Sequence, residues 1–319
     1  MAHIDHPGGP ARIVYLGSPE IAVAPLRSLV EAGHDVALVV TNPDRRRGRG
    51  KDLMPTPVKA AAAELGLAVS HELDDVLNAN AAFGVVVAYG HIIGNHILDA
   101  LPMVNIHFSL LPRWRGAAPL ERAILAGDAM TGVCLMEIAE ALDEGDVYDQ
   151  AEVPVAERTL DELRVALVDA SCELLVSALA TGLGGAKPQA GEVTYAHKLK
   201  AADFALDFTE PATQLARIVR LGRAHTTLHG KRFAIKAAGV DPSPHTQTPG
   251  ALDPGSAHSD ATSAGVRVAT GQGWLVLETV QPEGKKPAAA ADWIRGARLD
   301  ANTVLGDIVQ DQSAGSVDT

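Results

Sequence analysis

The sequence predicts a doubly wound α/β domain followed by a smaller domain built from short strands. Strand-like and helix-like segments alternate over the first 180 residues, which is typical of a parallel sheet with crossover helices. A stretch rich in Gly, Lys and Pro at 182–192 marks the start of a linker. Beyond residue 203, short strand-like segments separated by Gly and Pro turns are typical of a small barrel.

The elements of the first domain can be assigned in order. Residues 12–17 form an apolar strand, after which Ser18 and Pro19 fit the N-cap and first position of a helix that runs to about residue 32. Further strands are expected at 34–41, 67–70, 84–88, 104–106 and 132–138, and helices at 56–65, 73–80, 119–125 and 159–179. Gly17 alone is no dinucleotide-binding fingerprint.

The second domain is expected to begin with a helix at 212–219, followed by strands at 232–237, 265–270 and 274–280. Residues 241–264 are rich in Pro, Ser, Thr and His and predict a long mobile loop. The resulting organisation is a disordered leader (1–11), a first domain (12–185), a linker (186–204), a second domain (205–312) and a disordered tail (313–319).

Composition excludes several classes of protein. No apolar run in the 319 residues is long enough to span a bilayer, and residues 1–11 lack the apolar core of a signal peptide. Cys134 and Cys172 are therefore expected to be reduced thiols in the cytoplasm. The formal charge of −12 argues against indiscriminate nucleic-acid binding but leaves room for a local basic surface.

The strongest chemical signal is Asn105 and His107, which lie two positions apart on a predicted strand and so share one face. An amide beside an imidazole can bind a carbonyl oxygen and move a proton. Asp143 or Asp146, in a turn that follows, is positioned to orient the imidazole, and spacing alone does not choose between them. A purely structural histidine is the alternative. The histidine spacings predict no metal site, and no nucleophile motif is present.

Two basic segments stand out in this acidic chain. Residues 42–51 carry five cations against one acid, and they form either a solvated flexible loop or a phosphate contact. Residues 211–240 contain no Asp or Glu, and three of their arginines are spaced by three, as on one helix face. The cations of that window are Arg217, Arg220, Arg223, Lys231, Arg232 and Lys236.

Several of these motifs together resemble the methionyl-tRNA formyltransferase family. The most specific is the run 105–119, beginning Asn-Ile-His-Phe-Ser-Leu-Leu-Pro-Arg-Trp-Arg-Gly. Residues 41–44, 48–51, 53–55, 87–90, 142–146 and 193–196 also match, so the resemblance extends from about residue 12 to about residue 299. Residues 221–227 depart from the family, where Asn-Pro-Trp-Pro is expected.

The resemblance implies that the chain transfers the formyl group of the co-substrate 10-formyltetrahydrofolate to the α-amino group of methionyl initiator tRNA, for translation initiation. It implies a Rossmann-like formyltransferase domain followed by an OB-like tRNA-binding domain, in a cytoplasmic monomer without metal or a stable protein partner. The implied catalytic residues are Asn105, His107 and Asp143. The folate site is expected at Tyr89, Gly90, Ser109, Leu110, Leu111 and Pro112. The tRNA contacts are expected at Arg45, Arg46, Arg47, Arg49, Lys51, Arg220, Arg223, Lys231 and Arg232.

Two other functions remain open from the sequence. A folate-dependent formyltransferase acting on a small molecule would use the same Asn105 and His107, but it needs neither a basic loop nor a second domain. A non-catalytic tRNA-binding protein would need the basic segments but not Asn105, His107 and Asp143.

Overall fold

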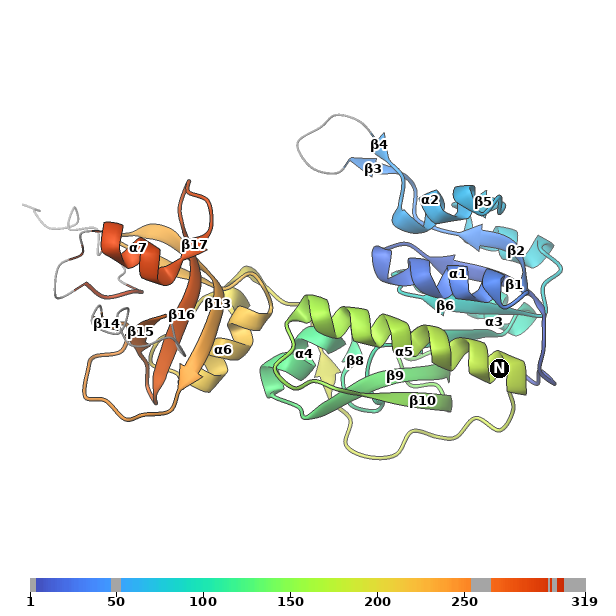
Figure 1. The fold of residues 1–319 in the computed structure, drawn as a ribbon. Helices are drawn as coiled ribbons and strands as arrows, with labels where there is room; N and C mark the ends of the chain where they lie inside the picture. Colours follow the sequence, from blue (N-terminus) through green and yellow to red (C-terminus); the bar gives the residue numbers. More distant parts are fainter. Residues whose placement is uncertain (1–3, 47–52, 254–264, 298, 300–302, 307–319) are drawn as a thin grey trace, which may run out of the picture. The chain divides into compact units, whose positions relative to one another are not determined.

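The structure is a computed structural model that describes residues 4–46, 53–253, 265–297, 299 and 303–306. The chain divides into two compact units, of which the first holds most of residues 4–198 and the second most of residues 199–306 (Figure 1). The predicted fold class is confirmed: a doubly wound α/β sheet is followed by a curled antiparallel sheet. No helix in the described ranges combines the length and the hydropathy needed to cross a bilayer.

The first unit is built on one seven-stranded sheet, ordered β10-β9-β7-β6-β1-β2-β5. Five neighbouring strands are parallel: β1 (Arg12–Gly17), β2 (Asp35–Val40), β5 (Val69–Ser70), β6 (Phe83–Val87) and β7 (Met103–His107). The strand order reverses between β1 and β6, and ligands of such sheets bind outside the carboxyl ends of the strands at that point.

Two antiparallel strands extend this sheet at the β7 edge. They are β9 (Met130–Glu137), which was predicted, and β10 (Val147–Pro154), which was not. β10 was not predicted because it is an edge strand whose side chains are mostly exposed or half-buried. It therefore lacks the apolar pattern by which strands are recognised in a sequence.

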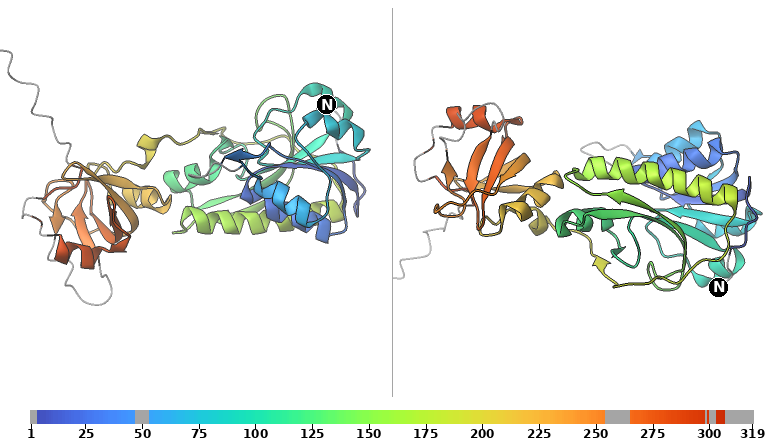
Figure 2. Two further views of the ribbon diagram at one scale, coloured as in Figure 1. Left: turned by 90° about the horizontal axis from the view of Figure 1, so that it is seen from above. Right: turned by 60° about the horizontal axis from the view of Figure 1, so that its bottom comes forward.

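Helices cover both faces of the sheet. α1 (Val23–Glu31) and α5 (Leu160–Thr181) lie on one face and the short α3 (Asn95–Ala100), which was not predicted, on the other (Figures 1 and 2). The first unit also contains α2 (Pro57–Glu64) and most of α4 (Pro119–Ala126). α2 begins as expected, with the Thr56 hydroxyl accepting a hydrogen bond from the Lys59 N–H at 3.0 Å.

Two predicted helices differ in detail. The helix after β1 does not begin at Ser18, since a 3-10 turn, η1 (Glu20–Ala22), precedes α1. The Ser18 hydroxyl instead accepts a hydrogen bond from the Asn42 N–H at 3.1 Å and so joins the ends of β1 and β2. The segment predicted as a helix at 73–80 forms a 3-10 helix, η2 (Leu73–Asn78).

The leader is also different from the prediction. Residues 4–9 are not disordered: Ile4 is only 5% exposed, and its N–H donates to the Tyr148 hydroxyl at 3.1 Å. The backbones of His6 and Leu183 exchange two hydrogen bonds of 2.8 Å. Residues 1–3 and the predicted tail at 313–319 lie outside the described residues.

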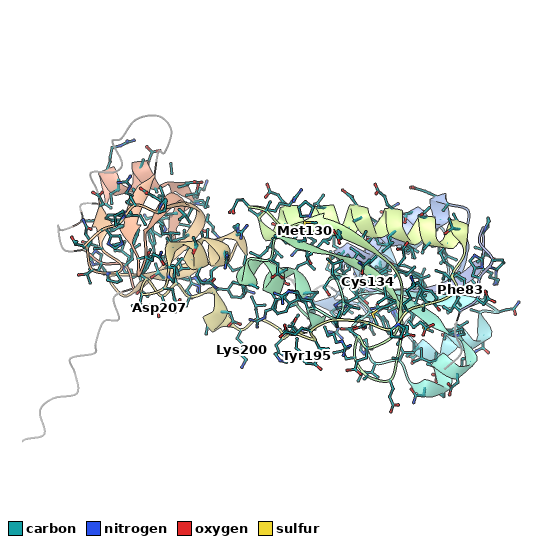
Figure 3. The ribbon with its side chains drawn as sticks, turned by 90° about the horizontal axis from the view of Figure 1, so that it is seen from below. Phe83, Met130, Cys134, Tyr195, Lys200 and Asp207 are labelled. Atoms are coloured by element: carbon teal, nitrogen blue, oxygen red, sulfur yellow. The ribbon has the colours of Figure 1, made fainter. Side chains whose placement is uncertain are left out.

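Much of the predicted linker packs on the first unit. The backbone of Lys187 pairs with that of Val147 through bonds of 2.8 and 2.9 Å. Further along, β11 (Tyr195–Ala196) pairs in parallel with β8 (Arg115–Gly116). Figure 3 shows Tyr195 on this extended segment. Residues 187–196 therefore pack on the first unit, where they pair with the start of β10 and with β8.

The second unit is an antiparallel sheet ordered β12-β13-β16-β15-β14, with β17 paired to β16. Its elements are α6 (Ala212–Arg220), β12 (His225–Leu228), β13 (Lys231–Asp241), β14 (Leu252–Asp253), β15 (Val266–Ala269), β16 (Trp274–Pro282), β17 (Ala288–Ala289) and α7 (Ala290–Gly296). Register shifts at two points in β13 mark irregularities of the bulge type, which bend a strand. α6 packs its apolar side on a core that includes Phe233, Leu275 and Leu277.

Candidate active site

The carboxyl end of β7 presents the predicted amide and imidazole. Asn105 lies beside Met136, and His107 beside Cys134, in the antiparallel pairing of β7 with β9. His107 is 6% exposed. Asn105 is half-buried, and within the described part of the chain its side-chain amide makes no hydrogen bond. The amide is therefore available to a ligand, whereas the imidazole is held by the protein.

Both ring nitrogens of His107 face acceptors. Nε2 lies 2.9 Å from the carbonyl oxygen of Trp114, and Nδ1 lies 3.6 Å from Oδ2 of Asp143. Nε2 is thus within hydrogen-bonding distance of a carbonyl, and a carboxylate lies beside Nδ1. These two groups fix the orientation of the ring.

The carboxylate beside His107 is Asp143 and not Asp146. Asp146 is bound through its backbone carbonyl, which accepts the Glu137 N–H at 2.9 Å, and its carboxylate is not within 4 Å of His107 in the described residues. Asp143 adopts a φ of +54°, which is unusual for a non-glycine residue. Its Oδ2 accepts a hydrogen bond of 2.8 Å from the Gly116 N–H. A glycine is required at 145, where a Cβ would lie 2.0 Å from the Glu137 carbonyl oxygen.

The Trp114 carbonyl that faces His107 is itself anchored. The Trp114 N–H donates to the Thr194 hydroxyl at 2.9 Å, and its indole N–H donates to Asp128 at 2.7 Å. Arg113 binds the same Asp128 carboxylate through two hydrogen bonds of 2.6 and 2.9 Å, which raise the pKa of its guanidinium above the ordinary value. Arg113 is thus a structural cation that fixes the 113–114 turn.

The predicted folate residues lie on two segments near the carboxyl ends of β6 and β7. Tyr89 is buried, which raises the pKa of its phenol, and its carbonyl accepts a 3.4 Å bond from the Asn42 amide. Gly90 is exposed. Ser109 is fully buried, and its hydroxyl donates to the Arg113 carbonyl at 2.6 Å. The Ser109 side chain is therefore committed to the turn, which sequence reasoning could not show.

Leu110, Leu111 and Pro112 continue this turn. Leu111 packs on Cys134 and Met136, and its N–H lies 3.4 Å from the Cys134 sulfur. Burial raises the pKa of the Cys134 thiol to about 11, so at neutral pH it is a protonated, poor nucleophile. Two apolar side chains close in sequence to the site face solvent: Ile92, two residues after Gly90, is 93% exposed, and Leu142 is 71% exposed.

Sequence reasoning missed two residues that hold the Asp143 loop. Arg115 donates to Glu144 at 2.7 Å, and Gln189 donates to the carbonyls of Asp143 and Gly145. Gln189 lies in the stretch predicted as a linker, and no sequence signal marks it. Arg115 belongs to the specific Arg-Trp-Arg-Gly run, which was the available clue.

The predicted basic loop is only partly described. Arg45 and Arg46 form β3 (Arg45–Arg46), which pairs with β4 (Leu53–Met54), and both arginines are exposed. The acid of this loop, Asp44, is bound by Lys59 at 2.7 Å, which leaves the loop more basic. Arg47, Arg49 and Lys51 lie outside the described residues.

The cations of the second unit do not share one helix face. α6 ends at Arg220, and Gly222 turns the chain with a φ of +77°, so Arg223 follows the helix instead of continuing it. Arg223 is exposed, and its guanidinium lies 4.2 Å from the centre of the Phe204 ring. Lys231 is exposed at the start of β13. The correction follows from the glycine that interrupts the spacing of three.

These cations are instead gathered by the sheet. Arg223, Arg232 and Lys236 line a surface hollow on the second unit. Glu283 is the one acid among the described lining residues, and the remaining ones are uncharged: Gly222, Ala234, Gln281, Pro282 and Gly284. Arg223, Arg232 and Lys236 are thus brought together at this hollow and not on one helix face. In the described ranges no group of three or more His, Cys, Asp or Glu side chains is arranged to hold a metal ion.

Comparison with known families covers both units. Formyl transferase matches residues 11–179, and formyl transferase, C-terminal domain, matches residues 198–298. The methionyl-tRNA formyltransferase of Chromobacterium violaceum is 39% identical over 317 residues, covering 92% of this chain and 99% of that protein. The methionyl-tRNA formyltransferase of Roseiflexus castenholzii is 41% identical over 315 residues, with the same two coverages of 92% and 99%.

Solved structures are similar in fold. An N-formyltransferase from Helicobacter canadensis, in complex with folinic acid and dTDP-3-aminofucose, has a TM-score of 0.63 at 14% identity, covering 85% of this chain and 99% of that one. HypX from Aquifex aeolicus, in complex with tetrahydrofolic acid, has a TM-score of 0.56 at 18% identity, covering 88% of this chain and 46% of that one.

Proposed function

The chain belongs to the formyl transferase family and, within it, to the methionyl-tRNA formyltransferases, and we propose that it transfers the formyl group of 10-formyltetrahydrofolate to the α-amino group of methionyl initiator tRNA. The observation that carries the proposal at the site is His107, held between Asp143 and the Trp114 carbonyl, next to the available amide of Asn105. This arrangement suits acyl transfer to an amine.

The reaction forms a bond between the amino nitrogen of the methionyl group and the formyl carbon, and it breaks the bond from that carbon to N10 of the folate. Negative charge develops on the formyl oxygen, and we assign its stabilisation to the Asn105 amide and the His107 ring. Asp143 keeps the ring oriented. The proton lost by the amine ends on N10, so no covalent intermediate with the protein is needed, which agrees with the protonated Cys134 thiol.

The folate is proposed to bind along Tyr89 and Gly90 and along the turn from Ser109 to Pro112. The exposed apolar side chains Ile92 and Leu142 support this, since a flat aromatic ring system would cover surface that otherwise faces water. Because the Ser109 hydroxyl is engaged with the Arg113 carbonyl, we assign the Ser109–Pro112 contribution to shape and backbone rather than to that hydroxyl.

The tRNA is proposed to contact two basic surfaces. One is the loop that holds Arg45, Arg46, Arg47, Arg49 and Lys51, and the other is the part of the second unit with Arg220, Arg223, Lys231 and Arg232. Exposed guanidinium and ammonium groups that face phosphate gain affinity by releasing counterions. We further propose a monomer that acts in the cytoplasm without a stable protein partner. Sedimentation of the purified chain tests whether it is a monomer.

One assay tests the function directly. The purified chain is incubated with 10-formyltetrahydrofolate and, in parallel, with methionyl initiator tRNA, methionyl elongator tRNA and free methionine. We expect formylation of the initiator species at a kcat/KM well above those of the other two. Equal use of free methionine would support a small-molecule formyltransferase, and tRNA binding without turnover would support a non-catalytic protein.

A further inference from the structure

A single amide, that of Gln189, joins the loop that carries Asp143 to the strand β8. Its Nε2 donates two hydrogen bonds, to the Asp143 carbonyl at 2.8 Å and to the Gly145 carbonyl at 2.9 Å. Its Oε1 accepts two more from Arg115, at 2.7 Å from Nη2 and at 3.1 Å from Nε. Both N–H donors of the amide and both acceptor positions of its oxygen are thus used within the first unit.

Arg115 completes the arrangement. Its third nitrogen, Nη1, donates to the carboxylate of Glu144 at 2.7 Å, and the Arg115 side chain is only 10% exposed. Gln189 and Arg115 therefore form hydrogen bonds with three consecutive residues of the loop. Gln189 binds the backbone at 143 and 145, and Arg115 binds the side chain at 144. The Arg115 guanidinium is nearly buried and donates three charge-assisted hydrogen bonds, which are stronger than neutral ones, although the Glu144 side chain is 45% exposed.

These hydrogen bonds matter because the backbone at Asp143 adopts an uncommon conformation. Asp143 has a φ of +54°, a left-handed conformation that is uncommon for a non-glycine residue and that hydrogen bonds to its backbone help to hold. That conformation directs Oδ2 toward the Gly116 N–H at 2.8 Å and toward Nδ1 of His107 at 3.6 Å. If the backbone at 143 relaxed, the carboxylate would leave both partners.

We propose that Gln189 is a positioning residue for the Asp143 carboxylate, acting through the backbone of residues 143–145. The expected effect on kcat rests on the proposed function, whereas the expected position of the Asp143 carboxylate does not. Gln189 itself is not assigned any contact with the reacting atoms. Its segment, 186–196, thereby serves as a brace of the active site rather than as a tether between units.

The competing explanation is that Gln189 only fastens its own segment to the first unit. That role would lower stability when Gln189 is replaced, but it would leave the position of Asp143 and the chemical step unchanged. The Gly116 amide separates the two explanations, because its N–H is bonded to Oδ2 of Asp143 and so reports where that carboxylate lies.

The test compares three full-length variants. Gln189→Met keeps the length of the side chain and loses all four hydrogen bonds. Gln189→Glu keeps an acceptor for Arg115 but loses both N–H donations to the loop. Gln150→Met is the matched control, because Gln150 is exposed on β10, away from this network. Amide hydrogen exchange at Gly116, steady-state kinetics and thermal unfolding are measured for each.

We expect exchange at Gly116 to accelerate at least about tenfold in Gln189→Met and Gln189→Glu and to stay unchanged in Gln150→Met. We expect kcat to fall about tenfold or more in both, since small misplacements of catalytic groups have large effects, with KM for folate and tRNA within about twofold. In an Asp143→Asn background, Gln189→Met should lower kcat no further, because both changes remove the same interaction.

Unchanged Gly116 exchange in both Gln189 variants would overturn the proposal, as would an unchanged kcat accompanied only by a lower unfolding temperature. A further full loss of kcat in the Asp143→Asn background would also overturn it, because Gln189 would then act independently of Asp143. A wild-type chain inactive on charged tRNA would instead refute the proposed function, and the Gly116 exchange would still decide the positioning role.

Discussion

The catalytic edge of the first unit and the basic hollow of the second unit are built in opposite ways. At the first, His107 is 6% exposed, the side chain of Asp143 is 12% exposed, and each is held by named partners. At the second, Arg223, Arg232 and Lys236 are exposed. The first site fixes the direction of a few groups, and the second gathers charge without fixing where each cation points.

The difference follows from what each site must recognise. Charge that develops during a reaction is stabilised by donors already aimed at it in a water-poor site, where a shift of an ångström matters. A phosphate chain is attracted over about a Debye length, so the number of cations matters more than the orientation of any one. Substitutions at the first site should therefore act on turnover, and substitutions at the second on binding.

The largest effect is expected for Asn105→Ala. The free amide of Asn105 is an oxyanion donor in the proposed mechanism, and removal of such a donor lowers turnover about a hundredfold or more. Folate affinity, measured by equilibrium binding, should remain within about twofold, and His107→Ala and Asp143→Ala should behave alike. Asn95→Ala, at the exposed start of α3, is the control. A loss confined to KM would assign Asn105 to binding and blur the contrast between the two sites.

The next effect separates two neighbouring carboxylates. Asp143→Asn removes the charge 3.6 Å from Nδ1 of His107, whereas Asp146 serves the loop through its backbone carbonyl, which Asp146→Asn preserves. We expect kcat to fall at least about tenfold more in Asp143→Asn, by analogy with carboxylates that orient a catalytic imidazole. A larger loss in Asp146→Asn, measured under saturating substrates, would mean that the wrong carboxylate has been assigned.

The two sites also differ in how much of them could be predicted from sequence. Asn105 and His107 were found because a strand places alternate residues on one face, and that rule is local. Gln189 was not found because it lies 46 residues from Asp143, in a segment whose composition is that of a linker. Long-range hydrogen bonds of this kind leave no periodic trace in a sequence.

The fold shows the same limit. Buried strands such as β6 were predicted from their apolar runs, and β10 was missed because an exposed edge strand has no such run. The three arginines of the second unit were placed on one helix face by their spacing, and Gly222 broke that face. The other two cations of the hollow, Arg232 and Lys236, lie on β13, and only the folded structure brings them beside Arg223.

A smaller effect is expected in the basic loop, at Arg49→Ala. Arg49 lies outside the described residues, and this prediction rests on the five cations of residues 42–51. Loss of one guanidinium near phosphate should raise the KM for charged tRNA by about fivefold, in keeping with the roughly 1 kcal/mol that a typical hydrogen bond contributes in net terms. The KM for folate should not change. Wild-type kinetics for both substrates would remove Arg49 from the tRNA site.

The smallest effect, and the one that tests the second site most directly, is expected for Arg232→Ala. Arg232 is exposed at the hollow, and none of its described neighbours there except Glu283 is an acid. If it neutralises one phosphate, tRNA affinity should fall by a few fold, and the slope of log affinity against log salt should become shallower by about one unit. Filter binding of charged tRNA at several salt concentrations measures both.

Arg295→Ala is the matched control for this measurement. Arg295 belongs to the same unit and is also exposed, but it lies on α7, outside the hollow, and is paired to Asp292. Removing it should leave the salt slope unchanged, because its charge is already balanced. kcat at saturating tRNA should be unaffected in both variants, in contrast to Asn105→Ala. If both arginine variants changed the slope equally, tRNA affinity would depend on the net charge of the second unit, and the hollow would not be the tRNA-binding site.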